Sequence, residues 1–237
     1  MLKKYASKVF SSWMIQNQEA VLSLLERGES LLDLGCGDAK LTQVFNSKVK
    51  AKKVVGVDFF GKTKKIKIIK SDLNKKLPFK DESFDIVISH YSLEHLYNTG
   101  VFISETYRVL KGGGYTVVTT DNLSAWPNIV SLILGFQPFS TTTGIGQRAI
   151  GNPLALRANF GEVQDKGIDL EWRKFGEYSH NKVLSYQALI DSYKHFGFDI
   201  ENVIGIGYFP FGGKLSKLLA NLDKRHAHLL ALKARKR

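Results

Sequence analysis

A glycine turn and two acidic side chains stand at places where a ligand could bind. The apolar run "LLDL" stops at Gly35, Cys36 and Gly37, and Asp33 lies two residues before the first glycine. Glycines allow a ligand to approach the backbone closely. A second apolar run ends at Asp58, 21 positions after Gly37. Carboxylates beside a glycine turn predict a site for a ligand that carries positive charge.

This turn does not match the site of a dinucleotide. The dinucleotide fingerprint needs a third glycine at position 40, where this chain has Lys40, and Asp33 would repel a pyrophosphate. S-adenosylmethionine carries an ammonium group, a sulfonium and no phosphate, so it suits the charges better. Asp33 would hold the ammonium directly or through water. Asp58 lies at the distance where an acid meets ribose hydroxyls in sheets of this class.

Three nearby residues fit the adenine of the same ligand. Phe59 follows Asp58 and could lie on the adenine face. Asp72, in "KSDL", is placed to accept from the adenine amino group, with the Leu73 amide beside it. Structural alternatives remain open, because Asp33 could cap a helix, Asp58 could serve a turn and Ser-Asp is common loop chemistry.

Short apolar strands alternate with helix-like segments and would position these residues. Continuous runs such as "IVIS" fit strands buried on both faces of a parallel sheet. The alternation implies a doubly wound α/β fold. The strands are predicted at Ser30–Leu34, Lys53–Asp58, Ile66–Lys70, Phe84–Ser89 and Gly114–Thr120, the last after a glycine turn in "LKGGGY". A leading helix is predicted over 7–27. A helix in "SYQALIDSYKHFGF", two closing strands and a short helix near 213–222 complete the chain.

The alternation lapses between 121 and 180, where prolines, glycines and aromatic residues accumulate. This stretch is too apolar for a disordered linker, so we expect an insertion that folds over the ligand edge as a substrate lid. The expected organisation is a single domain, 1–237. It comprises a leading helix at 1–28, a cofactor-binding core at 30–120, the insertion at 121–180, and a closing helix and strands at 181–237.

Five segments together resemble the successive motifs of class I S-adenosylmethionine-dependent methyltransferases, of the type 11-like kind. In order they are "LLDLGCGDAKLTQVF", "VVGVD", "KSDLNKKLPF", "FDIVISHYSLEHL" and "ETYRVLKGGGYTVVTT". The resemblance implies a Rossmann-like seven-stranded sheet, mostly parallel with the last strand antiparallel, and S-adenosyl-L-methionine as cofactor. By position it implies these cofactor-binding residues: Asp33, Gly35, Gly37, Asp58, Asp72 and Leu73, with Ser89 and His90 beside the sulfonium. Cys36 lies in the same loop, where we expect it to be inert packing.

One position departs from the family pattern. Ala39 stands where the family often has a third glycine, and we expect its methyl group to weaken cofactor affinity without abolishing binding. Glu94 and His95 in "SLEHL" are adjacent, so on a helix they cannot share a face, and we expect a structural role for both. No metal site is expected, and the single cysteine excludes a multi-cysteine one.

Methyl transfer mainly requires alignment and exclusion of water, and it requires a base only for a hydroxyl or a protonated amine. His90 and His180 are the candidate bases, and each could instead be an ordinary hydrogen-bonded histidine. The insertion "NLSAWPNIVSLILGFQPF" resembles methyltransferases of glycan and cell-surface polysaccharide synthesis. The predicted function is O-methylation of a glycan, lipid-linked or other small-molecule acceptor. The alternatives are an RNA methyltransferase and a non-catalytic cofactor-binding module.

The bulk composition adds a strong positive charge. The formal net charge is +12, with lysine runs at 48–53, 62–70 and 75–76 and a terminal "KARKR". Such patches attract RNA, anionic lipid surfaces and acidic glycans alike. Few aromatic or arginine residues interleave them as in base-stacking surfaces, which favours a solvated lysine-rich surface instead. No transmembrane segment or secretory signal is expected, so the chain is predicted to be cytoplasmic. The acceptor atom and the oligomeric state stay open.

Overall fold

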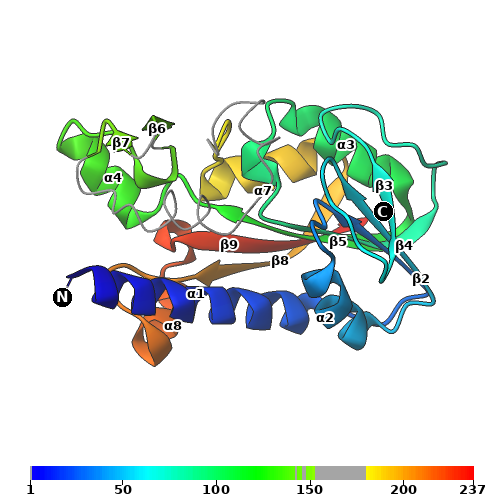
Figure 1. Cartoon of the computed structure of the whole chain (residues 1–237), viewed down its shortest axis with the longest axis horizontal. Helices are drawn as coiled ribbons and strands as arrows, with labels where there is room; N and C mark the ends of the chain where they lie inside the picture. Colours follow the sequence, from blue (N-terminus) through cyan, green and yellow to red (C-terminus); the bar gives the residue numbers. More distant parts are fainter. Residues whose placement is uncertain (1, 142, 146–147, 153–179) are drawn as a thin grey trace.

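The structure is a computed structural model that describes residues 2–141, 143–145, 148–152 and 180–237 (Figure 1). Its main sheet has seven strands in the order β3-β2-β1-β4-β5-β9-β8. In chain order they are β1 (Ser30–Leu34), β2 (Lys53–Asp58), β3 (Lys67–Lys70), β4 (Phe84–His90), β5 (Leu110–Asp121), β8 (Phe198–Ile206) and β9 (Leu229–Lys236). The pairings of β9 with β5 and β8 are antiparallel and the others are parallel. The predicted Rossmann-like α/β sheet, whose last strand alone is antiparallel, is confirmed.

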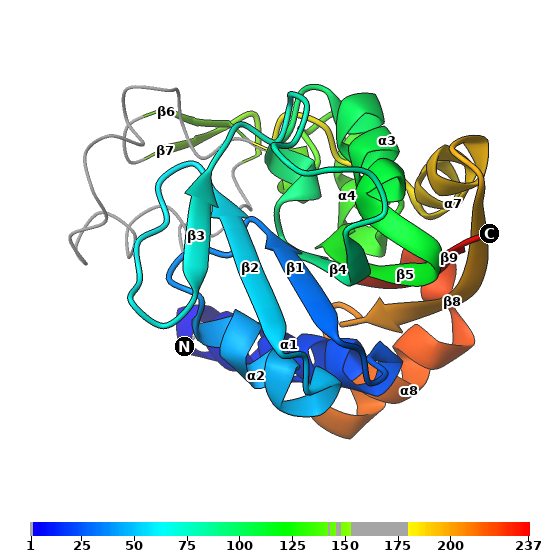
Figure 2. The same ribbon diagram turned by 90° about the vertical axis from the view of Figure 1, so that its right-hand side faces the viewer.

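Helices cover both faces of this sheet. α1 (Leu2–Leu24), α2 (Lys40–Val49) and α8 (Gly213–Leu222) lie on one face. α3 (Thr99–Val109), α4 (Trp126–Ile133) and α7 (Tyr186–His195) lie on the other side. The arrowheads of β1, β2 and β3 point toward the same edge of the sheet (Figure 2). Ligands of open α/β sheets bind at this carboxyl edge.

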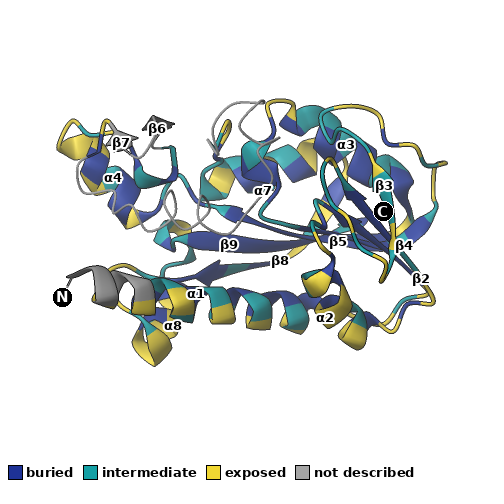
Figure 3. Cartoon of the chain, in the orientation of Figure 1, coloured by how far each residue is buried: buried dark blue, intermediate teal, exposed yellow. Residues whose placement is uncertain are grey.

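The central strands are buried on both faces, as their continuous apolar sequences predict (Figure 3). All five residues of β1 are buried. Leu32 and Leu34 pack in the core that includes Phe102 of α3, whereas Leu31 packs in the core that includes Phe45 of α2. Because side chains alternate along a strand, Asp33 faces the same side as Leu31 and lies under α2.

β5 begins four residues earlier than predicted. Phe84 pairs with Leu110, and Ile86 pairs with Tyr115. A step of two residues along β4 thus corresponds to a step of five residues along β5. The glycine-rich segment 111–114 is therefore a bulge inside the strand and not a turn before it, since the extra residues bend out of the ladder. The leading helix also differs from its prediction, because it ends at Leu24 and not near position 27.

The described part of the insertion contains α4, the short 3₁₀ turn η2 (Phe139–Thr141) and a hairpin of β6 (Thr143–Ile145) and β7 (Arg148–Ile150). Residues 142, 146–147 and 153–179, which make up half of the predicted lid, lie outside the described residues, so the lid stays a prediction. Two more 3₁₀ turns are η1 (Leu93–His95) and η3 (Lys224–His226). Among the described helices, none combines the length and apolarity that a membrane crossing needs.

Candidate functional site

Asp33 offers a buried acceptor that no described group uses. Its side chain is 3% exposed and its Oδ2 accepts a hydrogen bond from Thr42 Oγ1 at 2.5 Å. Its Oδ1 is buried and has no hydrogen-bond partner among the described residues. Burial raises the pKa of Asp33 to about 6, and the nearby Asp58 charge adds to this. Unsatisfied buried acceptors are rare in folded proteins, so this oxygen fits a ligand cation.

The glycine turn after β1 is packed at one end and open at the other. Gly35 has φ +86°, and a Cβ added there would lie 1.9 Å from Ser92 Oγ. Gly37 has φ +52°, and a Cβ added there would meet no described residue within 4 Å. The turn therefore has no room for a side chain at Gly35, whereas at Gly37 a side chain would cost only the left-handed backbone. Together with the unpartnered Asp33 oxygen, this open side fits a ligand with an ammonium group, as the resemblance implies.

Two other residues of this turn are buried in the fold. The Cys36 side chain lies against Gly56, where an added Cβ would be 2.4 Å from Cys36 Sγ, and burial raises the pKa of this thiol to about 12. The thiol is thus protonated at neutral pH and a poor nucleophile. Ala39 precedes α2 with φ 60° and is fully buried, so its methyl group does not stand on the open side of the turn. Its effect on cofactor affinity stays a prediction.

Asp58 ties the turn after β2 to the turn after β1. Its Oδ2 accepts from the Gly37 amide at 2.8 Å, and its Oδ1 accepts from the Phe60 and Gly61 amides at 2.8 and 2.6 Å. A carboxylate has about four lone-pair positions, so about one remains for a ribose hydroxyl. Phe59, the predicted adenine neighbour, is 47% exposed beside this turn.

The other predicted cofactor residues, Asp72, Leu73 and Ser89, lie at the same edge of the sheet. They differ in the groups that they can offer to a ligand. Asp72 Oδ1 accepts from the Asn74 backbone and side-chain amides at 2.9 and 3.0 Å, which closes a local turn. A Leu73 methyl lies 4.0 Å from where a Gly35 Cβ would be, so Leu73 borders the glycine turn. Ser89 is fully buried, and its hydroxyl donates to the Leu34 carbonyl at 3.0 Å. That hydroxyl joins β4 to β1.

His90, the first candidate base, is packed between aromatic rings. Its ring centroid lies 5.7 Å from that of Phe45 and 4.6 Å from that of Tyr91. Burial lowers the pKa of His90 to about 4, and its Nε2 has no hydrogen-bond partner among the described residues. His90 is therefore neutral at pH 7, and it holds a proton too weakly to be an efficient base.

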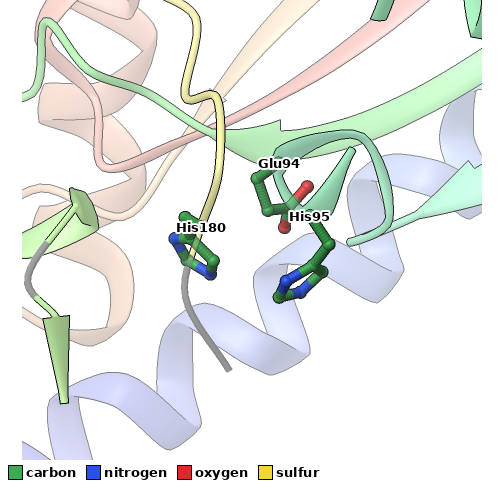
Figure 4. A group of neighbouring side chains, drawn as sticks. All are labelled: Glu94, His95 and His180. Carbon is green, nitrogen blue, oxygen red and sulfur yellow. The ribbon is translucent and has the colours of Figure 1, made fainter. Parts of the chain in front are cut away.

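His180, the second candidate, lies in a cluster of titratable groups (Figure 4). Its Nδ1 is 3.0 Å from Asp121 Oδ2, at the end of β5, and 2.7 Å from the Ser140 carbonyl. Its ring centroid is 5.0 Å from that of His95. Burial alone would lower the pKa of His180, but Asp121 and Glu94 raise it to about 9.

Glu94 is the most deeply buried member of this cluster. Its side chain is 1% exposed, and Thr120 Oγ1 donates to its Oε2 at 3.0 Å. Burial and the Asp121 charge raise the pKa of Glu94 well above its usual value. Glu94 and His95 were expected not to share a helix face. They lie in the 3₁₀ turn η1, and one ligand atom from each comes within 4.8 Å of the other and of a ligand atom of His180. Their structural role stays a prediction.

Backbone hydrogen bonds hold His180 beside this turn. The Asn181 and Lys182 amides donate to the Glu94 carbonyl at 2.8 and 3.1 Å. The Asn181 side chain also donates to the His95 carbonyl at 2.6 Å, across 86 positions of sequence. This pairing, like the contacts of Thr42 and Ser92, joins segments that no local sequence pattern connects, so the sequence did not predict it.

The pKa of Asp33 gives a testable pH dependence. We expect the affinity for S-adenosylmethionine to fall about tenfold for each pH unit below 6, because a bound ammonium stabilises the ionised carboxylate and acid removes that charge. Titration calorimetry between pH 5 and 7 measures this. An Asp33→Asn variant should bind more weakly and lose the pH dependence. A wild-type affinity that stays constant down to pH 5 would contradict the placement of the ammonium.

Comparisons with known proteins agree with this arrangement. A family model described as a methyltransferase domain matches residues 32–118. A probable S-adenosylmethionine-dependent methyltransferase of Mycolicibacterium smegmatis is 29% identical over 120 residues, which cover 46% of each chain. A mitochondrial ubiquinone biosynthesis O-methyltransferase of Rattus norvegicus is 26% identical over 201 residues, covering 78% of this chain and 49% of that protein. The match thus spans about half the length of these curated relatives.

The fold also matches solved structures along nearly its whole length. The crystal structure of an S-adenosylmethionine-dependent methyltransferase from Mesorhizobium loti superposes with a TM-score of 0.57. The superposition covers 92% of this chain and 96% of that one, at 20% identity. At this identity the likeness shows the fold.

Proposed function

The chain belongs to the class I S-adenosylmethionine-dependent methyltransferase family, and we propose that it methylates a hydroxyl oxygen of a small, glycan or lipid-linked acceptor. S-adenosylmethionine supplies an activated methyl group when it is bound. The residues of this chain then have to hold the donor, orient the acceptor, exclude water and take up the proton of the hydroxyl.

The donor half of the proposed site is built on β1 and β2. Asp33, whose Oδ1 has no partner among the described residues, would hold the ammonium, and the open side at Gly37 would admit the donor to the backbone. Asp58 would use its remaining lone pair for the ribose. Phe59 would cover the adenine, while Asp72 and Leu73 would border it.

The observation that carries the O-methylation proposal is the cluster of Glu94, His95 and His180 on the other side of Ser92. Ser92 is the residue before η1, and it touches Gly35 of the donor turn. A hydroxyl acceptor must lose a proton, and this cluster supplies imidazole and carboxylate groups next to the donor half. Asp121 orients the His180 ring through one of its nitrogens. Because the pKa of His180 is raised to about 9, the ring is mostly protonated at pH 7, and the proton of the hydroxyl would go to its minor neutral form or to another group of the cluster. The O-methyltransferase relative supports the same acceptor atom.

The experiment is incubation of the full chain with methyl-labelled donor and a fractionated cell extract. We expect the label to enter carbohydrate or lipid fractions, and an Asp58→Ala variant should transfer less label at limiting donor concentration. Label in RNA, with transfer that weakens steeply as salt rises, would instead support the RNA alternative and the lysine runs as its phosphate contacts. Donor binding without label in any fraction would support the non-catalytic module.

A further inference from the structure

We infer that Glu94, His95 and His180 form the ligand set of one divalent cation. Two imidazoles and a carboxylate suit Zn²⁺, Fe²⁺, Mn²⁺ or Co²⁺, whereas Mg²⁺ and Ca²⁺ prefer oxygen ligands alone. Cation binding stands on the geometry of this chain. The part of the inference that concerns catalysis rests on the proposed function.

The ligand atoms lie near one another but not yet at the separation of a formed site. One atom from each of the three residues lies within 4.8 Å of the other two. A tetrahedral zinc ion that binds its ligands at ~2.0–2.2 Å holds them roughly 3.3–3.6 Å apart. A pair at the 4.8 Å limit would therefore have to close by roughly 1.2–1.5 Å, which rotation of the imidazole rings about their side-chain bonds would provide. His95 and His180 are partly exposed, so a cation can reach the site from outside.

Asp121 gives the cluster a second feature typical of metal sites. A histidine that binds a metal commonly donates its other ring N–H to a carboxylate, which fixes the tautomer and orients the ring. Here the Nδ1 of His180 faces Asp121 Oδ2 at 3.0 Å and the Ser140 carbonyl at 2.7 Å. The Nε2 is the remaining ring nitrogen and would be the one that binds the cation. Thr120 Oγ1 likewise fixes one oxygen of Glu94 at 3.0 Å.

Hydrogen bonds fix the backbone segments that carry the three proposed ligands. Three hydrogen bonds from Asn181 and Lys182 to the carbonyls of Glu94 and His95 hold the two ligand segments together. η1 is in turn preceded by Ser92, whose hydroxyl donates to the Leu34 carbonyl of β1 at 3.2 Å. Ligands supported in this way stay in place before the metal arrives, which lowers the cost of binding.

A cation bound here would favour an acceptor whose hydroxyl can coordinate the cation. Three protein ligands leave at least one coordination position open, as in catalytic zinc sites. A hydroxyl in that position becomes more acidic, because the cation stabilises its anion. The proton leaves to solvent, the oxygen forms the new bond to the methyl carbon, and the electron pair of the broken S–C bond stays on sulfur. His180 would then be a metal ligand and not a free base.

The test uses the full chain, stripped with a chelator and titrated with Zn²⁺ and with Co²⁺. We expect one cation per chain and, for Co²⁺, a visible absorption band that imidazole ligation produces. Glu94→Gln and His95→Ala should each abolish both signals. Asp121→Asn should weaken the affinity ~10–100-fold. His226→Ala is the matched control, because His226 also pairs with a carboxylate, at 2.9 Å from Asp223, and should leave both signals unchanged.

The outcomes separate the inference from the proposed function. Absence of saturable one-to-one uptake by the wild type, with thermal unfolding showing a folded chain, overturns the inference. Uptake that Glu94→Gln and His95→Ala leave intact also overturns it. One-to-one uptake that depends on these residues supports the cation site even if no acceptor is methylated. Methyl transfer that proceeds fully in excess chelator would support the proposed function and overturn the catalytic role of the cation.

Discussion

Gly35→Ala is expected to lower the free energy of unfolding by ~2–5 kcal/mol and to abolish measurable binding of S-adenosylmethionine. A left-handed backbone costs a non-glycine residue about 1–2 kcal/mol, and Gly35 has φ +86°. Overpacking typically costs a further ~1–3 kcal/mol. Here the new Cβ would lie 1.9 Å from Ser92 Oγ and 2.8 Å from Ser92 Cβ, so one of the two segments has to move. Denaturant unfolding and titration calorimetry measure the two effects.

Movement at Ser92 matters beyond stability because this residue joins the two halves of the proposed site. Its hydroxyl donates to the Leu34 carbonyl beside the donor turn, and η1, with Glu94 and His95, follows it directly. Gly35→Ala should therefore disturb the donor turn and the cluster together. A partial recovery of stability in the Gly35→Ala/Ser92→Ala double variant would identify the Ser92 hydroxyl as the source of the clash.

Gly37→Ala is the matched control for this prediction. Within the part of the chain that the structure describes, its Cβ would meet nothing within 4 Å, so the free energy of unfolding should fall only by the backbone cost, about 1–2 kcal/mol. Donor affinity should nevertheless fall, because the methyl group would stand on the open side of the turn. If Gly35→Ala bound the donor as tightly as the wild type, the glycine turn would not be the donor site.

The sequence predicted the sheet well because its central strands are buried on both faces. β1 and β2 begin and end at the predicted residues, since a continuous apolar run bounded by polar residues leaves little freedom. The start of β5 was harder to predict, because its bulge depends on pairing with β4. In the sequence alone, the glycines of this segment resemble a turn. Local patterns thus predicted the positions of the central strands and the α/β class, while the strand order and the bulge of β5 came from the folded chain.

The candidate site was predictable where one motif supplies the residues and unpredictable where distant segments meet. Asp33, Gly35 and Asp58 follow from strand ends and glycines. Thr42 and Ser92 act through contacts that only the folded chain creates. The approach of His180 to Glu94 depends on backbone hydrogen bonds between segments far apart in sequence. The directions of the Glu94 and His95 side chains depend on η1, a 3₁₀ turn where a helix was expected.

Asp58→Ala is expected to reduce donor affinity by ~10–100-fold. Three backbone amides, those of Gly37, Phe60 and Gly61, would lose their acceptor. A hydrogen bond to a charged group is worth ~1.5–3 kcal/mol, and each 1.4 kcal/mol is about tenfold in affinity. Titration calorimetry measures the loss, with Asp72→Asn as a milder control because Asp72 mainly closes its own local turn. An unchanged affinity would remove Asp58 from the donor site.

A loss of affinity in Asp58→Ala has two physical sources that a ligand comparison separates. The carboxylate could act only by holding the Gly37 and Gly61 turns together, or it could also bind the ribose. Titrating both the donor and its 2′-deoxy analogue against wild type and variant forms a double-mutant cycle. If Asp58 binds the ribose, the variant should lose less affinity for the deoxy analogue than for the donor. Equal losses of affinity for the two ligands would mean that Asp58 acts only by holding the two turns together. The ribose hydroxyls would then need another acceptor.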